Sequence, residues 1–329
     1  MHASLRFRAL VISALSALGG SALAAQAPAA PQITVSGVVF TQYQYVDAPV
    51  HNNTFEVQRA YVNVLGRFAN GISTRVTTDI QPAAVGNQVI RLKYAFAAWT
   101  PTGSSLTYKL GMIQTPYVDF EETLWDYRMQ GTIAVDRNGA LTSADVGFGV
   151  DGRWNNEQVN AQFAVVNGEG YSGGTGDFRK DLEARVSFRL KPTDDASRVG
   201  GLRLTGYAGI GKATGGADRN RYLGLLSYRT QQYTLAGEYV ARTDGAVDGS
   251  IISAFGVYRF TGGKTAAIAR IDIVDPNTAV ANNKVTRIIA GASYQLSPNI
   301  RLLADLDRQS FESGATDINQ ILFQAQFVF

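Results

Sequence analysis

The sequence comprises 329 residues, of which 45% are hydrophobic and 17% are charged. A chain of this size can build one large core or one large barrel, and its composition does not choose between them. It contains no cysteine, which excludes disulfide bonds, thiol chemistry and thiolate metal sites. Without Arg6 and Arg8, which lie in the leader described next, the 30 basic residues fall to 28 and oppose 27 acidic ones, so no affinity for nucleic acid is expected.

Residues 1–24 are predicted to be a secretory signal peptide. Arg6 and Arg8 precede a short apolar run over residues 9–20, and small residues two apart then mark cleavage after residue 24 or residue 27. A buried N-terminal helix is the alternative, but the run is too short to span a bilayer. The remaining chain, 28–329, is expected to form a single domain. It has no uncharged apolar run of the ~18 residues that a membrane helix needs, so the exported product is periplasmic, secreted or a barrel.

From residue 32 onward the chain repeats one pattern, an alternating polar and apolar stretch closed by Gly, Pro, Asn, Asp or Ser. This period of two is typical of half-buried strands. About sixteen stretches follow it, and they begin near Ile33, Thr54, Ile72, Val89, Ser104, Ser143, Gln158, Lys180, Gly200, Arg219, Gln232, Gly249, Lys264, Lys284, Ile300 and Asn319. No long segment has a convincing helical period, and no shift in composition indicates a second domain.

The links between these stretches alternate in length. Links after an even-numbered stretch are tight, as at residues 69–71, 155–157 and 261–263, and residues 192–199 are the one longer exception. Links after an odd-numbered stretch are all expected to be more extended, and the longest covers residues 116–142. Short turns on one side and long loops on the other are typical of an outer-membrane barrel.

The faces of the stretches agree with this interpretation. In the eighth, Leu182, Val186 and Phe188 lie opposite Glu183 and Arg185. A soluble sandwich would also alternate, but about sixteen strands favour closure. The sequence therefore predicts an all-β fold, a transmembrane antiparallel β-barrel of about sixteen strands, with lipid of the outer membrane as its surroundings.

Aromatic residues recur where even-numbered stretches end. They are Phe68, Trp99, Trp154, Phe188, Tyr228, Phe260, Tyr294 and Phe329. Such a series predicts a girdle at the membrane interface, although a general preference of strands for aromatic residues is an alternative. Trp99 breaks the parity of its own stretch, because Ile90, Leu92, Tyr94 and Phe96 are expected on the opposite face.

Three segments resemble the phosphate-selective porin O/P family. They are FEVQRAYVNVLGRF (residues 55–68) with STRVTTDI (73–80), GMIQTPYV (111–118), and the C-terminal ILFQAQFVF, whose Phe329 is similar to the assembly signal of many barrels. Gln114 stands where the family typically has a lysine. The resemblance implies a sixteen-stranded porin for passive diffusion of small solutes, a homotrimer, and a loop after the fifth strand that folds into the pore.

Charges on the polar face are expected to line the channel and to set its ion preference. The candidate pore-lining residues are Arg59, Arg67, Arg75, Arg91, Lys93, Lys109, Arg185 and Arg189, and those of the constricting loop are Asp119, Glu121, Glu122, Asp126, Arg128 and Arg137. The basic excess on the wall predicts a mild anion preference, unless these bases pair across strands and only stiffen the wall. The acidic loop argues against a specific phosphate site, unless its acids turn toward the wall and pair with arginines there.

Other functions have weaker support. An outer-membrane hydrolase would need His51 as its base, and the only GxSxG match, around Ser172, sits in a glycine-rich loop without a strand-turn-helix context. Asp244 and Asp248 could hold calcium weakly, but no calcium-loop motif surrounds them. We therefore expect no enzyme activity, metal or cofactor. A plugged barrel that serves as an anchor or adhesion surface shares every strand feature with a pore.

Overall fold

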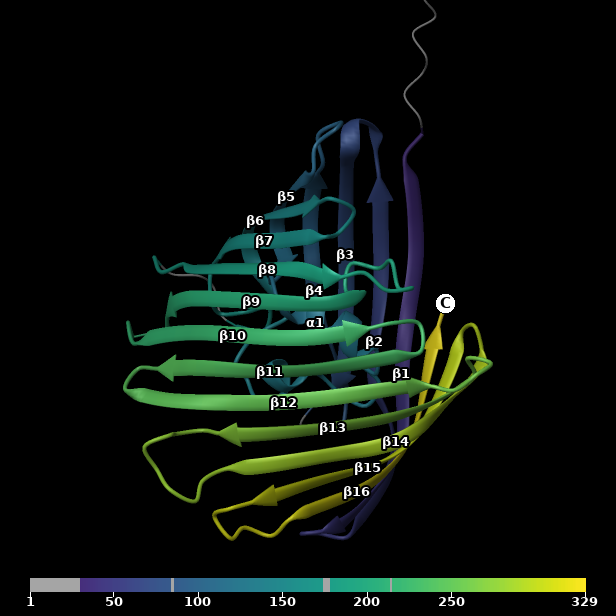
Figure 1. Ribbon diagram of the computed structural model, residues 1–329, viewed down its shortest axis with the longest axis vertical. Coiled ribbons are helices and arrows are strands. Elements are labelled where there is room, and N and C mark those ends of the chain that lie inside the picture. The colour runs from purple at the N-terminus through teal and green to yellow at the C-terminus, as the bar shows by residue number, and fades with distance from the viewer. Residues whose placement is uncertain (1–29, 84–85, 174–177, 214) are drawn as a thin grey trace, which may run out of the picture. The chain divides into compact units, whose positions relative to one another are not determined.

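Sixteen strands form one closed antiparallel barrel in the computed structural model of the chain, which describes residues 30–83, 86–173, 178–213 and 215–329 (Figure 1). Each strand pairs with its neighbours in sequence, and β1 pairs with β16 to close the ring. The strands are β1 (Gln32–Ala48), β2 (Asn52–Arg67), β3 (Ile72–Pro82), β4 (Gln88–Trp99), β5 (Leu106–Gln114), β6 (Ala144–Trp154), β7 (Val159–Val166), β8 (Asp181–Lys191), β9 (Gly201–Lys212), β10 (Asp218–Arg229), β11 (Tyr233–Asp244), β12 (Val247–Arg259), β13 (Thr265–Asp275), β14 (Val285–Ser297), β15 (Ile300–Phe311) and β16 (Ile318–Val328).

The predicted fold class is confirmed, and every strand begins within two residues of its expected start. Two links that were expected to be extended are short. The strands on either side are longer than expected, so that only residues 49–51 join β1 to β2 and only residues 245–246 join β11 to β12. The helices α1 (Val118–Trp125) and α2 (Ala134–Arg137) lie in the long link after β5, and η1 (Ala69–Gly71) is a single turn. The predicted signal peptide lies outside the described residues.

None of the helices in the described residues is long and apolar enough to cross a membrane.

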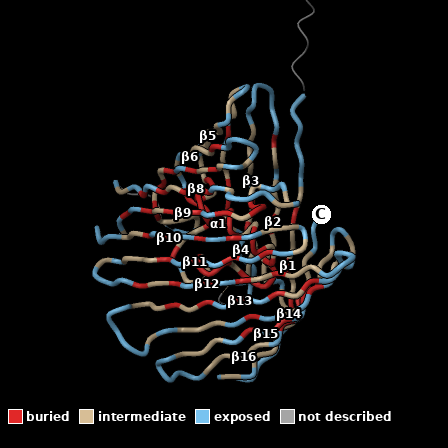
Figure 2. Tube along the Cα trace, viewed as in Figure 1, coloured by how far each residue is buried: buried red, intermediate tan, exposed pale blue. Residues whose placement is uncertain are grey.

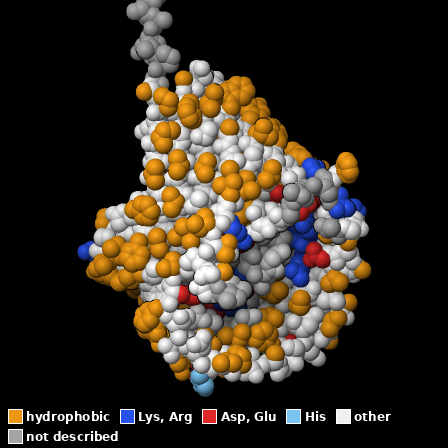
Figure 3. Space-filling view, turned by 180° about the vertical axis from the view of Figure 1, so that it is seen from behind, with side chains coloured by type: hydrophobic (Ala, Val, Ile, Leu, Met, Phe, Trp, Pro, Cys, Tyr) orange, Lys and Arg blue, Asp and Glu red, His pale blue; other side chains and the backbone are white. Residues whose placement is uncertain are grey.

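The outer surface of the barrel is apolar. Along β8, Leu182, Val186 and Phe188 are exposed, whereas Glu183 and Arg185 are buried inside the ring. Hydrophobic side chains cover the outside in Figure 3, and all eight aromatic residues of the expected girdle are exposed. A closed ring leaves no unpaired edge, and an apolar band around it matches lipid, so the barrel belongs in a bacterial outer membrane as expected.

A β-bulge in β4 explains the broken parity at Trp99. Thr77 of β3 pairs with Tyr94 and Thr78 pairs with Leu92, so Lys93 is an extra residue with no partner in the register. The extra residue reverses the two faces of the strand beyond it. Leu92 is therefore exposed on the outside, Tyr94 is buried inside the barrel, and Trp99 is exposed again. The expectation that Tyr94 shares a face with Leu92 was wrong for this reason.

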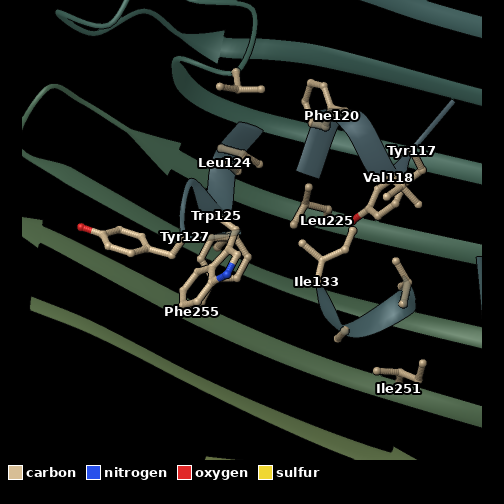
Figure 4. Close-up of a cluster of buried hydrophobic side chains, with 14 of the residues drawn as sticks. Tyr117, Val118, Phe120, Leu124, Trp125, Tyr127, Ile133, Leu225, Ile251 and Phe255 are labelled. Carbon is tan, nitrogen blue, oxygen red and sulfur yellow. The ribbon is translucent and has the colours of Figure 1, made fainter. Parts of the chain in front are cut away.

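The hydrophobic core lies inside the barrel, where the link between β5 and β6 (residues 115–143, the inner loop) folds against the wall. Buried residues gather around α1 in Figure 2. Figure 4 shows α1 and the segment after it packed on β10 and β12, with Trp125 against Phe255. Their ring centroids are 5.2 Å apart in an edge-to-face arrangement. The inner loop is thus fixed to one part of the wall by apolar burial.

Candidate functional site

Arginines of the wall hold the backbone of the inner loop. A loop inside a barrel has carbonyl groups without secondary-structure partners, and these groups need donors. The bonds run from Arg185 Nε to Pro116 O (2.7 Å), from Arg301 Nη1 to Asp126 O (2.8 Å), from Arg270 Nη1 to Thr132 O (2.9 Å) and from Arg221 Nε to Ala140 O (2.8 Å). These four arginines come from β8, β15, β13 and β10, so the loop is held along much of its length.

Two tyrosines of the inner loop form side-chain anchors. The Tyr117 hydroxyl donates to Glu238 Oε2 of β11 at 2.6 Å, and the Tyr127 hydroxyl and Ser293 Oγ of β14 are 2.7 Å apart. Glu121 of α1 is also buried, and it lies close to Glu238. Burial, together with the charge of Glu238, raises the pKa of the Glu121 carboxyl well above its usual value. Glu121 therefore keeps its proton where an exposed glutamate has lost it.

The other acids of the inner loop mostly face arginines. Arg198, in the link between β8 and β9, binds Asp119 Oδ2 at 2.6 Å. Burial alone would raise the pKa of Asp119, but Arg198 holds it below its usual value. Asp126 Oδ2 lies 3.4 Å from Arg301 Nη1. Asp119 and Asp126 thus turn toward arginines of the barrel. The sequence had left this arrangement open as the case in which an acidic loop is compatible with a phosphate site.

Glu122 pairs within the inner loop, with its Oε1 atom 2.9 Å from Arg128 Nε. Arg128 also donates to the Tyr61 hydroxyl of β2 at 3.2 Å. This contact brings the loop against the basic part of the wall.

Six of the candidate pore-lining bases lie on β2 to β5; five of them, all except Arg67 at the end of β2, form one group, and three of the five pair with acids on neighbouring strands. Arg59 Nε donates to Asp79 Oδ1 at 2.8 Å, and Arg91 Nη2 lies 3.6 Å from Oδ2 of the same aspartate. Lys109 binds Asp151 at 2.5 Å. The expected alternative of cross-strand pairing therefore holds for these three bases.

The other two bases of this region rest on aromatic rings. Arg75 lies over Tyr94, 4.4 Å from the ring centroid, and Lys93 lies 4.7 Å from the centroid of Tyr61. In such contacts the ring attracts the cation and leaves its positive charge in place.

Three candidate bases lie elsewhere. Arg67 is exposed at the end of β2, and Arg189, near the end of β8, donates to the backbone of Asn156 in a neighbouring turn. Arg185 is buried, donates to the inner loop and stacks 4.3 Å from the ring centroid of Phe120. These three do not join the group on β2 to β5.

A polar cavity of about 480 Å³ separates the inner loop from β1 to β3 and β14 to β16. Its charged lining comprises Arg59, Arg128, Arg137 and Arg287 against Glu56 and Asp307. Six glutamines complete its polar surface, at positions 42, 44, 58, 81, 130 and 320. Burial and the nearby charges of Arg287 and Arg270 lower the pKa of Arg137 to about 9. Basic side chains therefore outnumber acidic ones in the lining of the cavity.

The residues required by a hydrolase do not come together. His51 is exposed and faces Asp47 at 3.4 Å, whereas Ser172 Oγ accepts a bond from Arg91 at 2.8 Å. A nucleophile needs its base within hydrogen-bond reach. In the described part of the chain the two side chains share no such bond.

The candidate calcium ligands are likewise engaged elsewhere. Asp244 accepts a bond from Arg221 at 2.6 Å, and Asp248 accepts one from Thr243 at 2.7 Å. Across the described ranges, no group of three or more potential ligands is placed to hold a metal ion.

Sequence reasoning missed Arg198 and Arg221 as residues that position the inner loop. Arg198 lies in residues 192–199, and the unusual length of that turn was the available signal. Arg221 shares the inner face of β10 with Leu223 and Leu225, both buried, while the outer face of that strand is apolar too. Without a polar face, alternation could not mark Arg221 as inward.

The barrel is similar to solved porin structures. The anion-selective porin from Comamonas acidovorans aligns with a TM-score of 0.68 at 14% identity, over 91% of this chain and all of that one. OmpF of Salmonella typhi, in complex with daunomycin, aligns at 0.66 and 12% identity, over 90% and 97%. A loop-deletion mutant of OmpT, an outer membrane protein of Vibrio cholerae, aligns at 0.66 and 13% identity, over 91% and 100%.

Neither a protein-family model nor a curated protein sequence matches the chain. Identities this low show a shared fold. The chain is a sixteen-stranded β-barrel with the fold of outer-membrane porins.

Proposed function

We propose that this protein is a porin that lets small hydrophilic solutes and ions diffuse passively across the outer membrane, with a mild preference for anions. The observation that carries the proposal is the position of the inner loop. It is fixed to one part of the wall, and a polar cavity of about 480 Å³ with a charged lining remains beside it. An apolar outside and a polar lumen are the arrangement of a water-filled channel.

The proposed path runs between the inner loop and the strands β1 to β5. Arg59, Arg75, Arg91, Lys93 and Lys109 line it on the wall side. On the loop side, Arg128 and Arg137 line the cavity. Arg185 acts on the loop in this proposal, because its donors are used to hold Pro116 and Asn160.

The anion preference rests on the charge balance at the cavity. Four arginines oppose two acids there, and low-dielectric walls focus that excess into the lumen. The similar barrel from Comamonas acidovorans is described as anion-selective, which supports the same assignment. Pairing of Arg59 with Asp79 limits the excess, so the preference is mild.

A homotrimer in outer-membrane lipid is the proposed assembly. The trimer form of Vibrio cholerae OmpT has the same fold and supports it. We assign no enzymatic activity to the chain, since Ser172 and His51 have different partners.

The test is the reversal potential across a planar bilayer under a potassium chloride gradient. We expect the sign of an anion-preferring channel, and a shift toward cations when Arg59→Gln and Arg137→Gln are combined. Arg308→Gln is the matched control. This arginine is exposed and does not line the cavity, and its Nη2 atom lies 2.8 Å from Oδ2 of Asp317. A cation-selective unmodified channel would contradict the anion preference.

A plugged barrel is the second candidate, favoured by the amount of lumen that the inner loop fills. Liposome swelling with small sugars separates the two functions. Swelling supports the porin, and its absence with correctly folded protein supports the anchor.

A further inference from the structure

A second cavity lies inside the barrel, beside the end of the inner loop. It has a volume of about 340 Å³ and is bounded by the end of the inner loop, residues 168–172 of the link after β7, and the strands β8 to β10. Its acidic lining comprises Asp136, Asp145, Glu169, Asp181 and Glu183, against two arginines. The cavity thus has the opposite charge balance to the proposed path.

The two arginines of the cavity are engaged elsewhere. Arg221 donates to the backbone of Ala140 and Thr243 and to Asp244. Arg219 binds Asp181 Oδ2 at 2.6 Å and also the carbonyl of Gly168. Among the described residues, neither guanidinium donates a hydrogen bond to Glu183.

Asp145 is satisfied by the backbone. Its Oδ1 atom accepts a bond from the Val146 amide, and its Oδ2 atom accepts bonds from the amides of Gly168 and Gly170 at 2.7 and 3.0 Å. This aspartate holds the loop after β7 in place and leaves no oxygen for a ligand.

Glu183 is different, because it is only 8% exposed and its Oε2 atom has no hydrogen-bond partner in the described part of the chain. The Tyr207 side chain lies beside the carboxyl, and the residues directly opposite Glu183 on the neighbouring strands are Ala164 and Gly209. Neither of these can donate from a side chain. Gly209 also lines the cavity. A buried carboxylate oxygen without a donor, such as Oε2 of Glu183, costs free energy that a cationic ligand would offset.

Asp181 adds a second acceptor at the same place. It is two residues from Glu183 on the same face of β8, and its Oδ1 atom also lacks a partner among the described residues. Two buried acceptors in a cavity of this volume can receive the several donors of one ammonium group. The described residues offer no cluster suited to a metal ion, which directs the choice to an organic cation.

We propose that this cavity binds small organic cations that carry a primary ammonium group, with Glu183 as the main acceptor and Asp181 as the second. The site is independent of the proposed pore function, since binding requires only the folded barrel. An ammonium there donates charge-assisted hydrogen bonds to oxygens that otherwise have none.

The experiment compares two ligands of the same shape on the folded full chain in detergent. Isothermal titration calorimetry at neutral pH measures binding of 4-amino-1-butanol and of 1,4-butanediol, which differ in a single ammonium group. We expect the amine to bind at least about tenfold more tightly than the diol, as one charge-assisted hydrogen bond provides. Equal binding of the two, or binding of neither, overturns the proposal without any variant.

Variants then locate the site. Glu183→Gln keeps the shape of the side chain and removes its charge, so the preference for the amine is expected to disappear. Asp317→Asn is the matched control, because Asp317 lies in the link before β16 and pairs with Arg308, and it is expected to keep the preference. Circular dichroism checks that both variants are folded. An unchanged preference in Glu183→Gln, or displacement of the amine by calcium at equal concentration, contradicts the assignment.

Discussion

Replacing Tyr117 by phenylalanine is expected to loosen the inner loop more than the same replacement at Tyr127. Both rings are buried in that loop, and both hydroxyls reach the wall. Their partners differ. Tyr117 donates to Oε2 of the Glu238 carboxyl group, whose Oε1 atom has no hydrogen-bond partner in the described residues, whereas Tyr127 meets the hydroxyl of Ser293.

The magnitude follows from that difference. A hydrogen bond to a charged group contributes about 1.5–3 kcal/mol, and a neutral one about 0.5–1.5 kcal/mol. The separation of 2.6 Å between the Tyr117 and Glu238 oxygens is in the range of charge-assisted bonds. We therefore expect Tyr117→Phe to cost at least about 1 kcal/mol more than Tyr127→Phe, which is roughly a fivefold change in the docking equilibrium.

Trp125 provides the assay, because it is fully buried in the inner loop while Trp99 and Trp154 are exposed on the barrel. With the two exposed tryptophans changed to phenylalanine, fluorescence during a guanidinium titration reports release of the loop, and circular dichroism reports the barrel. The fluorescence midpoint should fall more in Tyr117→Phe, with the circular dichroism midpoint less affected. Equal shifts, or a larger shift in Tyr127→Phe, would refute the reasoning.

Three further predictions concern the loop and the strands. The docked loop keeps Glu121 protonated, so docking of the loop is strongest at acid pH. Its free energy weakens by about 1.4 kcal/mol per pH unit as the pH rises above the ordinary glutamate pKa of about 4.3. Glu121→Gln should remove this pH dependence in the same fluorescence assay. Gly37→Val should reduce the yield of folded barrel by overpacking worth about 1–3 kcal/mol, since a Cβ there would lie 2.2 Å from the Phe329 ring, while Gly206→Val on an open surface should refold normally. Deletion of Lys93 should prevent folding, measured by heat-modifiable migration on gels, whereas Lys93→Met should fold.

The strands could be located from sequence because their signals are local. Alternation and turn residues lie within each stretch, and they placed every strand start within two residues. The bulge at Lys93 could not be found this way. An extra residue is defined only by the pairing of β4 with β3, and the sequence showed no more than its effect, the misplaced parity of Trp99.

The attachment of the inner loop was equally beyond local reasoning. The resemblance implied a loop inside the pore, but not which part of the wall would hold it. Arg221 and Ala140 are 81 residues apart, and Tyr117 and Glu238 are 121 apart. Such contacts depend on the closed ring, so the acids and arginines of the loop region could be named from sequence without being paired.

The polarity of the inward-facing residues indicates which part of the wall the inner loop covers. A barrel strand that faces water on its inside carries polar residues there, and apolar residues are stable inside only where something covers them. Leu225, Val240, Ile251 and Ile268 point inward from β10 to β13 and are buried in the core that the inner loop completes. The strands β2 to β5 keep charged residues inside instead. Strands that are apolar on both faces therefore mark the docking side of the loop, and strands with inward charges mark the path. Substitutions of inward residues on β10 to β13 should therefore change the stability of the docked loop and leave ion preference largely unchanged. Substitutions of inward charges on β2 to β5 should change ion preference and leave loop stability largely unchanged.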